Sequence, residues 1–469
     1  MIVSFVKVKL FALILGPIGF GVISQFSNFQ IFLTGVICLG IPVGLTTLVA
    51  QRYQKKNFYE IQSLIVYLGL ITFVFALIIS ITLIFLSKHL SSYLVNDESG
   101  YSILIILMLM IPFLIQYSLL EAYLKGTDQI NLIVKINLIN SFLSLIIIFP
   151  LTYYFSVYGA AIFMFISGLL PLFIFMFLAK FDFRKLFKIK IEFKPNLLKN
   201  IIKIGIVSLA SSFLFQLSMI QLRKFIIDNY GIQSAGIYQT VLGLSTSYFV
   251  IIYTYLSLYS LPQFSKIENN IDIIKELNNN LRFLLFLIIP MAMLLLSFKN
   301  EYLIVFYSSE FLKASDYFYY QILGDIFRVL AALFGLWLIP KVKIFALLSI
   351  DLTLNVLLLT LPIVSSFLFH KNLIYISMIY LIAFMVHFSL YFIYSKIKLG
   401  FKLEKKTIKS IVLAVIISTI SIAANLFLVE YSKIIVIVIL LIGTYLIFDK
   451  DEKKKIYTFV NLIINRPNL

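Results

Sequence analysis

Charged side chains lie inside stretches of this sequence that are otherwise apolar, and their chemistry needs an explanation. Arg328 is near the middle of one such stretch, and Asp325 and Gln321 precede it on the same predicted helical face. Placing an ionisable group at the centre of a membrane helix costs about 2.5–3.5 kcal/mol, so the group must face protein or water. This face is either an internal ion pair that fixes helix packing or a polar patch that lines a central cavity.

A second polar run occurs in the stretch 201–227, where Gln216 is followed by Arg223 and Lys224. These cations have the chemistry to bind an anion inside a cavity. A lysine near a helix end also extends its apolar stem toward the lipid headgroups, which is the alternative for Lys224. Lys9 has the equivalent position in the first apolar stretch, and this symmetry favours a cavity.

Three further polar residues lie inside apolar stretches. Asn137 is expected either to bridge helices or to line the cavity, and Asp351, like Asp325, has the chemistry to temper the positive charge of the cavity or to bind a coupling proton or cation. His387 is predicted to be a packed, neutral histidine rather than a proton relay.

The composition excludes several classes of protein. Hydrophobic residues make up 61% of the 469 residues, more than a soluble domain of this size can bury. Cys38 is the only cysteine, and the three histidines form no cluster with it, so neither a disulfide nor a metal site is expected. The net charge of +18 is spread over alternate gaps between apolar stretches, which argues against a nucleic-acid partner. No cofactor or enzyme motif is present, and a transporter is predicted.

The apolar stretches run through the whole chain, and each can cross about 30 Å of hydrocarbon as a helix. We predict an all-α polytopic membrane protein with about fourteen transmembrane helices. The expected spans are 1–23, 29–50, 61–86, 101–124, 132–156, 158–180, 201–227, 236–262, 281–307, 317–340, 342–369, 373–395, 408–429 and 432–448.

Most of the 39 lysines and arginines lie in every second gap, which predicts that these gaps and the C-terminus are cytoplasmic. The longest basic gap divides the chain into two lobes of about six helices each. The expected parts are an N-lobe (1–181), a basic cytoplasmic linker (182–200), a C-lobe (201–398) and an additional hairpin with a basic tail (399–469). The hairpin is interpreted as membrane filler.

A weak internal repeat supports the two lobes. The glycine-rich segments 16–21 and 231–236 have the same glycine spacing, and a lysine precedes each by seven residues. Asn137 and Asp351 correspond at nearly the same offset. An even number of crossings separates the copies, so the repeats are parallel and related by a pseudo-twofold axis along the membrane normal.

Four stretches carry a resemblance to a known family: GPIGFGVISQF (16–26), YGIQSAGIYQ (230–239), YSLPQFSKI (259–267) and QILGDIFRVLAALFGLWLIPK (321–341). Over residues 7 to about 398 the chain resembles the Wzx-type polysaccharide flippases of the multidrug/oligosaccharidyl-lipid/polysaccharide exporter superfamily. Relative to that family, residues before the first span are expected to be missing, and the C-terminal hairpin is extra.

The resemblance implies a flippase in the bacterial inner membrane. Its substrate would be an undecaprenyl-pyrophosphate-linked oligosaccharide, such as a repeat unit of O-antigen, capsule or common antigen, moved to the periplasmic leaflet by alternating access. Membrane lipids, a polysaccharide polymerase and a chain-length regulator are the other implied partners. A cavity bearing Lys9, Arg223, Lys224 and Arg328 would take the pyrophosphate.

Three alternatives stay open at this point. A peptidoglycan lipid II flippase is related and has a similar number of spans. A drug/cation antiporter of the same superfamily would need a net acidic cavity. A glycan polymerase or acyltransferase would need a large periplasmic loop, which the short gaps do not provide.

Overall fold

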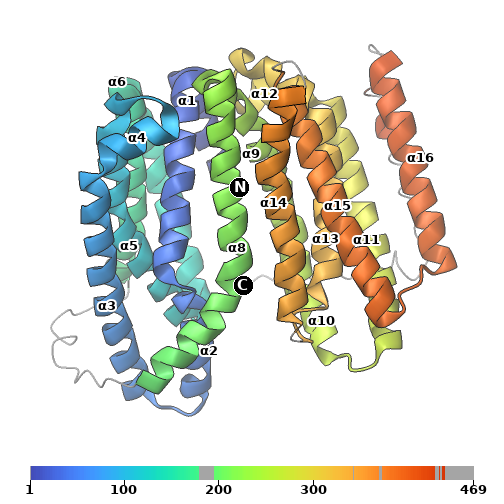
Figure 1. Cartoon of the computed structure of the whole chain (residues 1–469). Coiled ribbons are helices and arrows are strands. Elements are labelled where there is room, and N and C mark those ends of the chain that lie inside the picture. The colour runs from blue at the N-terminus through green and yellow to red at the C-terminus, as the bar shows by residue number, and fades with distance from the viewer. Residues whose placement is uncertain are drawn as a thin grey trace. The chain divides into compact units, whose positions relative to one another are not determined.

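The computed structural model describes residues 2–178, 195–341, 343–368 and 372–427, with Lys433 and residues 436–438 (Figure 1). Every regular element within these residues is a helix, and none is a strand. The first elements are α1 (Ile2–Cys38), α2 (Ile41–Gln54), α3 (Phe58–Phe85), α4 (Ser87–Val95), η1 (Glu98–Gly100), α5 (Tyr101–Gly126), α6 (Ile130–Leu178), α8 (Pro195–Tyr230) and α9 (Ile232–Tyr255). They are followed by η2 (Leu256–Ser260), α10 (Leu261–Lys266), α11 (Asn270–Ser297), α12 (Lys299–Phe306), η3 (Ser309–Tyr317), α13 (Phe318–Leu336), α14 (Ile344–Leu368), α15 (Ile374–Leu399) and α16 (Lys405–Phe427).

Nine helices in the described part of the chain are long and apolar enough to cross a membrane. This confirms an all-α protein with many spans. The number of about fourteen stays a prediction. The expected last span (432–448) lies mostly outside the described residues, as do most of the basic linker and the whole tail after residue 438.

The N-terminal boundary differs from the prediction. A gap was expected at residues 24–28, but α1 continues through it and breaks instead at Gly16, where φ is 60° and ψ is −176°. This backbone conformation is essentially confined to glycine. The prediction was wrong because Ser27 and Asn28 read as a polar gap. Inside the helix Ser27 donates a hydrogen bond to the carbonyl of Ile23, and Asn28 donates one to the carbonyl of Ser24, which satisfies both side chains without a loop.

The short turn predicted between spans 132–156 and 158–180 is present as a break within α6. Ser156 has φ 50° and ψ −127°, and the chain is helical on both sides. The apolar pattern continues across Ser156 without a polar gap. The turn could be predicted only because the two stretches together are too long for a single membrane span.

By contacts the chain forms two compact units, Met1–Gly236 with Phe306–Ser308, and Ile237–Val305 with Ser309–Leu469. The first unit includes α8, whereas the boundary expected from the sequence lay at residue 181. Its core centres on α5, whose Leu104, Leu107 and Ile111 are fully buried. In the second unit, α13 and α14 both pack against α15, and α11 packs against α13 and α16.

Two glycine-rich turns, which correspond in the predicted repeat, meet within the first unit. A Cβ added at Gly236 would lie 1.9 Å from the carbonyl oxygen of Pro17, and one added at Gly21 would lie 2.5 Å from that of Ile232. At the offset of the predicted repeat, Gly21 corresponds to Gly236 and Pro17 corresponds to Ile232. Each glycine therefore contacts the same position in the other copy, as expected for two copies related by a twofold axis, and this supports the internal repeat.

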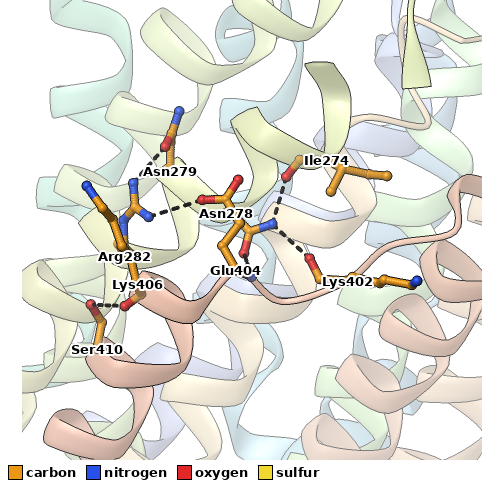
Figure 2. A network of polar contacts seen from close by, with 8 residues as sticks. All are labelled: Ile274, Asn278, Asn279, Arg282, Lys402, Glu404, Lys406 and Ser410. Carbon is orange, nitrogen blue, oxygen red and sulfur yellow. Dashed lines mark hydrogen bonds and ion pairs between the residues drawn. The ribbon is translucent and has the colours of Figure 1, made fainter. Parts of the chain in front are cut away.

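Helix α16 packs against α11, and a cluster of polar side chains and backbone groups at the start of α16 joins the two helices (Figure 2). The fully buried amide of Asn278 donates to the carbonyls of Ile274 and Lys402, at 2.9 and 3.0 Å, and accepts from the backbone N–H of Glu404 at 3.0 Å. Arg282 forms an ion pair with Glu404 at 3.5 Å. The other end of α16 is held by Asn425, which donates to Ser297 at 3.0 Å.

We expect Asn278→Ala to loosen this attachment and to lower the free energy of unfolding by about 1–3 kcal/mol, because the substitution leaves buried backbone groups without partners. Thermal unfolding in detergent, together with protease cleavage between α15 and α16, measures the effect. Asn229→Ala is the matched control, because in the part of the chain that the structure describes that amide donates only to the carbonyl of Phe225 in its own helix. Equal stability losses in the two variants would contradict the attachment.

Candidate functional site

Helix α13 places Asp325 and Arg328 on one face, as predicted, and this face lies against α15. The hydroxyl of Tyr380 lies between the two charges. It donates to Oδ1 of Asp325 at 2.9 Å and accepts from a guanidinium nitrogen of Arg328 at 3.2 Å. Asp325 and Tyr380 are completely buried, whereas Arg328 is half-buried. The tyrosine therefore fixes both charged side chains within the second unit.

Aromatic rings surround the Arg328 guanidinium. Its central carbon lies 4.6 Å from the ring centre of Phe249 and 5.6 Å from that of Phe384. A guanidinium interacts well with aromatic faces, and its planar set of donors matches the oxygens of a phosphate. This arrangement can hold a cation at membrane depth and present it to an anion. The internal polar network is thus observed, while the lining of a cavity by this face stays a prediction.

Gln321 extends the network toward α9. It is fully buried, and its Oε1 accepts a hydrogen bond from the hydroxyl of Tyr238 at 2.9 Å. Its Nε2 has no hydrogen-bond partner in the described part of the chain. Gln321 therefore bridges α9 and α13 and retains one buried donor.

A second titratable cluster joins α14 to α15. Oδ1 of Asp351 lies 3.1 Å from Nε2 of His387 and accepts from the hydroxyl of Tyr391 at 2.7 Å. His387 is packed, as expected, but its partnership with Asp351 was missed. The sequence did offer one indication of this pair. An acidic side chain at membrane depth needs a polar partner, and His387 lies in the span that follows Asp351.

Lys224 lies in a different environment, within the first unit. It forms an ion pair with Asp228, one turn further along α8, and donates to Oδ1 of Asn96 at 3.0 Å. Its ammonium also lies 5.3 Å from the ring centre of Tyr93. These contacts attach α8 to the end of α4 and balance the charge of Lys224.

The other predicted residues of the first unit are spread over three helices. Lys9 on α1 and Gln216 and Arg223 on α8 are half-buried. Asn137 on α6 is exposed and accepts from the hydroxyl of Tyr117 at 2.9 Å. The four predicted cations thus divide between the units, with Arg328 in the second, and their gathering in one cavity stays a prediction.

We expect Lys224→Ala and Asp228→Asn each to have a small effect on stability, about 1 kcal/mol or less, since both remove one partly exposed ion pair. Thermal unfolding of both single variants and of the double variant tests this. Glycan export measured in the same strains tests the role of the charge. Export lost in Lys224→Ala but kept in Asp228→Asn would show that Lys224 binds substrate instead of only attaching α8.

No group of three or more histidine, cysteine, aspartate or glutamate side chains that could hold a metal ion occurs among the described residues.

Comparison with known proteins gives three findings. The family model described as "Polysaccharide biosynthesis protein" matches residues 10–316. The lipid III flippases of Escherichia coli (strain K12) and Shigella flexneri are each 24% identical over 349 residues, which cover 72% of this chain and 80% of the relative. A multidrug resistance MATE family transporter of the MOP superfamily, solved in an inward-facing conformation, matches with a TM-score of 0.71 at 15% identity, covering 85% of this chain and 94% of that one. An outward-facing structure matches with a TM-score of 0.62 at 14% identity, covering 85% and 92%.

Proposed function

Because the chain belongs to the polysaccharide biosynthesis protein family, we propose that it is a flippase for a lipid-linked oligosaccharide. The substrate is an undecaprenyl-pyrophosphate-linked repeat unit of a surface polysaccharide. The protein moves this substrate from the cytoplasmic to the periplasmic leaflet of the bacterial inner membrane by alternating access, and its C-terminus lies in the cytoplasm. A polysaccharide polymerase and a chain-length regulator, which would consume the delivered glycan, are its proposed partners.

The chemistry of the substrate explains why such a protein needs a cation at membrane depth. A pyrophosphate and a glycan are too polar to enter hydrocarbon without a hydrogen-bonding path. The observation that carries the proposal is the Arg328 guanidinium, half-buried between aromatic rings and fixed by Tyr380. It binds the pyrophosphate through charge-assisted hydrogen bonds, while the lipid tail remains in the bilayer.

The remaining predicted cations contribute less to this proposal. The charge of Lys224 is balanced by Asp228, so we assign the principal anion-binding role to Arg328. Lys9 and Arg223 are proposed to add positive charge along the path of the headgroup. The lipid III flippases among the relatives, together with the polysaccharide biosynthesis family, support a lipid-linked glycan as the substrate class.

Genetic complementation tests the proposed function. The gene is expressed in a strain that lacks its polysaccharide flippase, in a strain depleted of its lipid II flippase, and in a drug-sensitive strain without multidrug exporters. We expect surface glycan to return in the first strain and no rescue in the other two. Rescue of growth in the lipid II strain, or of drug resistance, without surface glycan would contradict the proposal.

A further inference from the structure

The Asp351–His387–Tyr391 cluster has a feature that the anion site does not explain. His387 is only 8% exposed, and its buried Nδ1 has no hydrogen-bond partner in the described part of the chain. Buried ring nitrogens normally have a partner, because leaving one without any costs about 1–3 kcal/mol. The cluster therefore holds an unused basic nitrogen inside the helix bundle.

The hydrogen bonds of the cluster determine which form of the imidazole is present. An ionised Asp351 only accepts hydrogen bonds, so Nε2 of His387 must carry the hydrogen that points to Oδ1. Tyr391 donates its hydroxyl hydrogen to the same oxygen. With a neutral ring, Nδ1 is then a free lone pair, and the three side chains together carry one negative charge.

We propose that the Asp351–His387 pair is a proton-binding site that takes up one proton at Nδ1 of His387. Uptake forms an imidazolium beside the carboxylate, and the net charge of the cluster changes from −1 to zero. A net charge held within a membrane helix is costly, so its removal by a proton is favourable. The side chain of Asp351 is 19% exposed, so the pair is not fully enclosed by its neighbours.

The buried amide of Asn355 provides an acceptor near this site. Asn355 lies one turn after Asp351 on α14, is 3% exposed, and its Oδ1 has no partner among the described residues. Its amide nitrogen donates to the backbone carbonyl of Asp351 at 2.7 Å. The vicinity of the pair thus contains both a basic nitrogen and an amide oxygen that have no partner among the described residues.

The charged groups around His387 come from several helices. Asp351 lies on α14 and Tyr391 on the same helix as His387. From α13, Arg328 and Asp325 approach the same face of α15 through Tyr380, and the ring of Phe384 lies between Arg328 and His387. Two other elements also pack against α15, namely α11 and η3. Their charged residues form no hydrogen bond or ion pair with His387 in the described part of the chain: Asp272, Lys275, Glu276 and Arg282 on α11, and Glu310, Lys313 and Asp316 on η3.

One face of α15 therefore connects the proton site to the anion site. Tyr380, Phe384, His387 and Tyr391 follow one another at helical spacing, and Arg328 contacts the first two. A lower negative charge at Asp351 favours an anion near Arg328, and by linkage a bound anion favours the proton. This consequence for transport rests on the proposed function, whereas the proton site itself does not.

Nitrogen NMR of the full-length protein in lipid nanodiscs tests the proton site without any substrate. The protein is labelled at its three histidines, and His387→Gln identifies the signal of His387. We expect the ring nitrogens of His387 to change from the neutral to the doubly protonated pattern between about pH 9 and about pH 5. In Asp351→Asn the midpoint should change, because the imidazolium loses the carboxylate that lies beside it. Tyr391→Phe, which keeps both partners, should still titrate.

Two results would overturn the proton site: a His387 signal that stays neutral over the whole range, or a midpoint that Asp351→Asn leaves unchanged. Glycan export at several external pH values is measured in parallel with wild type and His387→Gln. Titration without export in the wild type would refute the flippase function and leave the proton site intact. Export with a His387 that does not titrate would refute the proton site alone.

Discussion

Arg328→Ala should reduce glycan export by at least about tenfold, because hydrogen bonds to a charged group contribute about 1.5–3 kcal/mol to binding. Surface glycan in a flippase-null strain that carries only the variant gives the measurement. The protein should still insert and fold, because Tyr380 and Asp325 keep their hydrogen bond to one another. The amount of variant protein in the membrane is measured alongside to separate binding from expression.

Arg52→Ala is the matched control for this experiment. Arg52 is also a partly buried arginine, in an ion pair with Glu60 at 3.1 Å, but it lies at the end of α2, in the first unit, whereas Arg328 belongs to the second. Its loss should leave export close to that of the wild type. Arg328→Lys should restore only part of the export, because a lysine keeps the charge but not the planar set of donors. Normal surface glycan in Arg328→Ala would remove the anion-binding role.

Gly236→Ala should destabilise the folded protein by more than about 3 kcal/mol, at the upper end of what overpacking costs. The new Cβ would lie 1.9 Å from the carbonyl oxygen of Pro17 and 3.0 Å from the backbone nitrogen of Gly21. Both atoms belong to the backbone, so no side chain can move aside, and the two turns must separate. Thermal unfolding followed by size-exclusion chromatography in detergent measures the loss.

Gly35→Ala provides the control for Gly236→Ala. Gly35 lies in α1, and apart from the neighbouring residues and backbone of its own helix no described atom lies within 4 Å of a Cβ added there. Alanine is the better helix former by about 1 kcal/mol, so this variant should be as stable as the wild type or more stable. A Gly236→Ala protein with the thermal stability of Gly35→Ala would show that the two glycine-rich turns do not meet as described.

The sequence predicted the helical face of Asp325 and Arg328 because spacing within one helix determines which side chains share a face. It did not predict Tyr380, which lies on another helix and joins the two charges through its hydroxyl. The same limit applies to His387, whose partner Asp351 lies 36 residues away. Contacts between helices depend on rotation and packing, which apolar periodicity alone does not determine.

The ends of the helices were predictable where the apolar stretch itself ended, as for α5 and α15. They were not predictable where polar residues bond to their own helix, as Asn28 does in α1. The attachment of α16 was also missed. It depends on Asn278, whose importance comes from its position opposite the backbone of Lys402 and Glu404.

Reconstitution gives the most direct measurement of the central claim, that the Arg328 site carries a diphosphate-linked glycan across the membrane. Liposomes are prepared with the undecaprenyl-pyrophosphate oligosaccharide in both leaflets, and a glycan-cleaving enzyme is added outside. We expect wild-type protein to make the inner-leaflet share accessible, whereas Arg328→Ala leaves that share protected, as in protein-free liposomes. Wild-type protein that leaves the inner pool protected, or an Arg328→Ala protein that exposes it at the wild-type rate, would contradict the account.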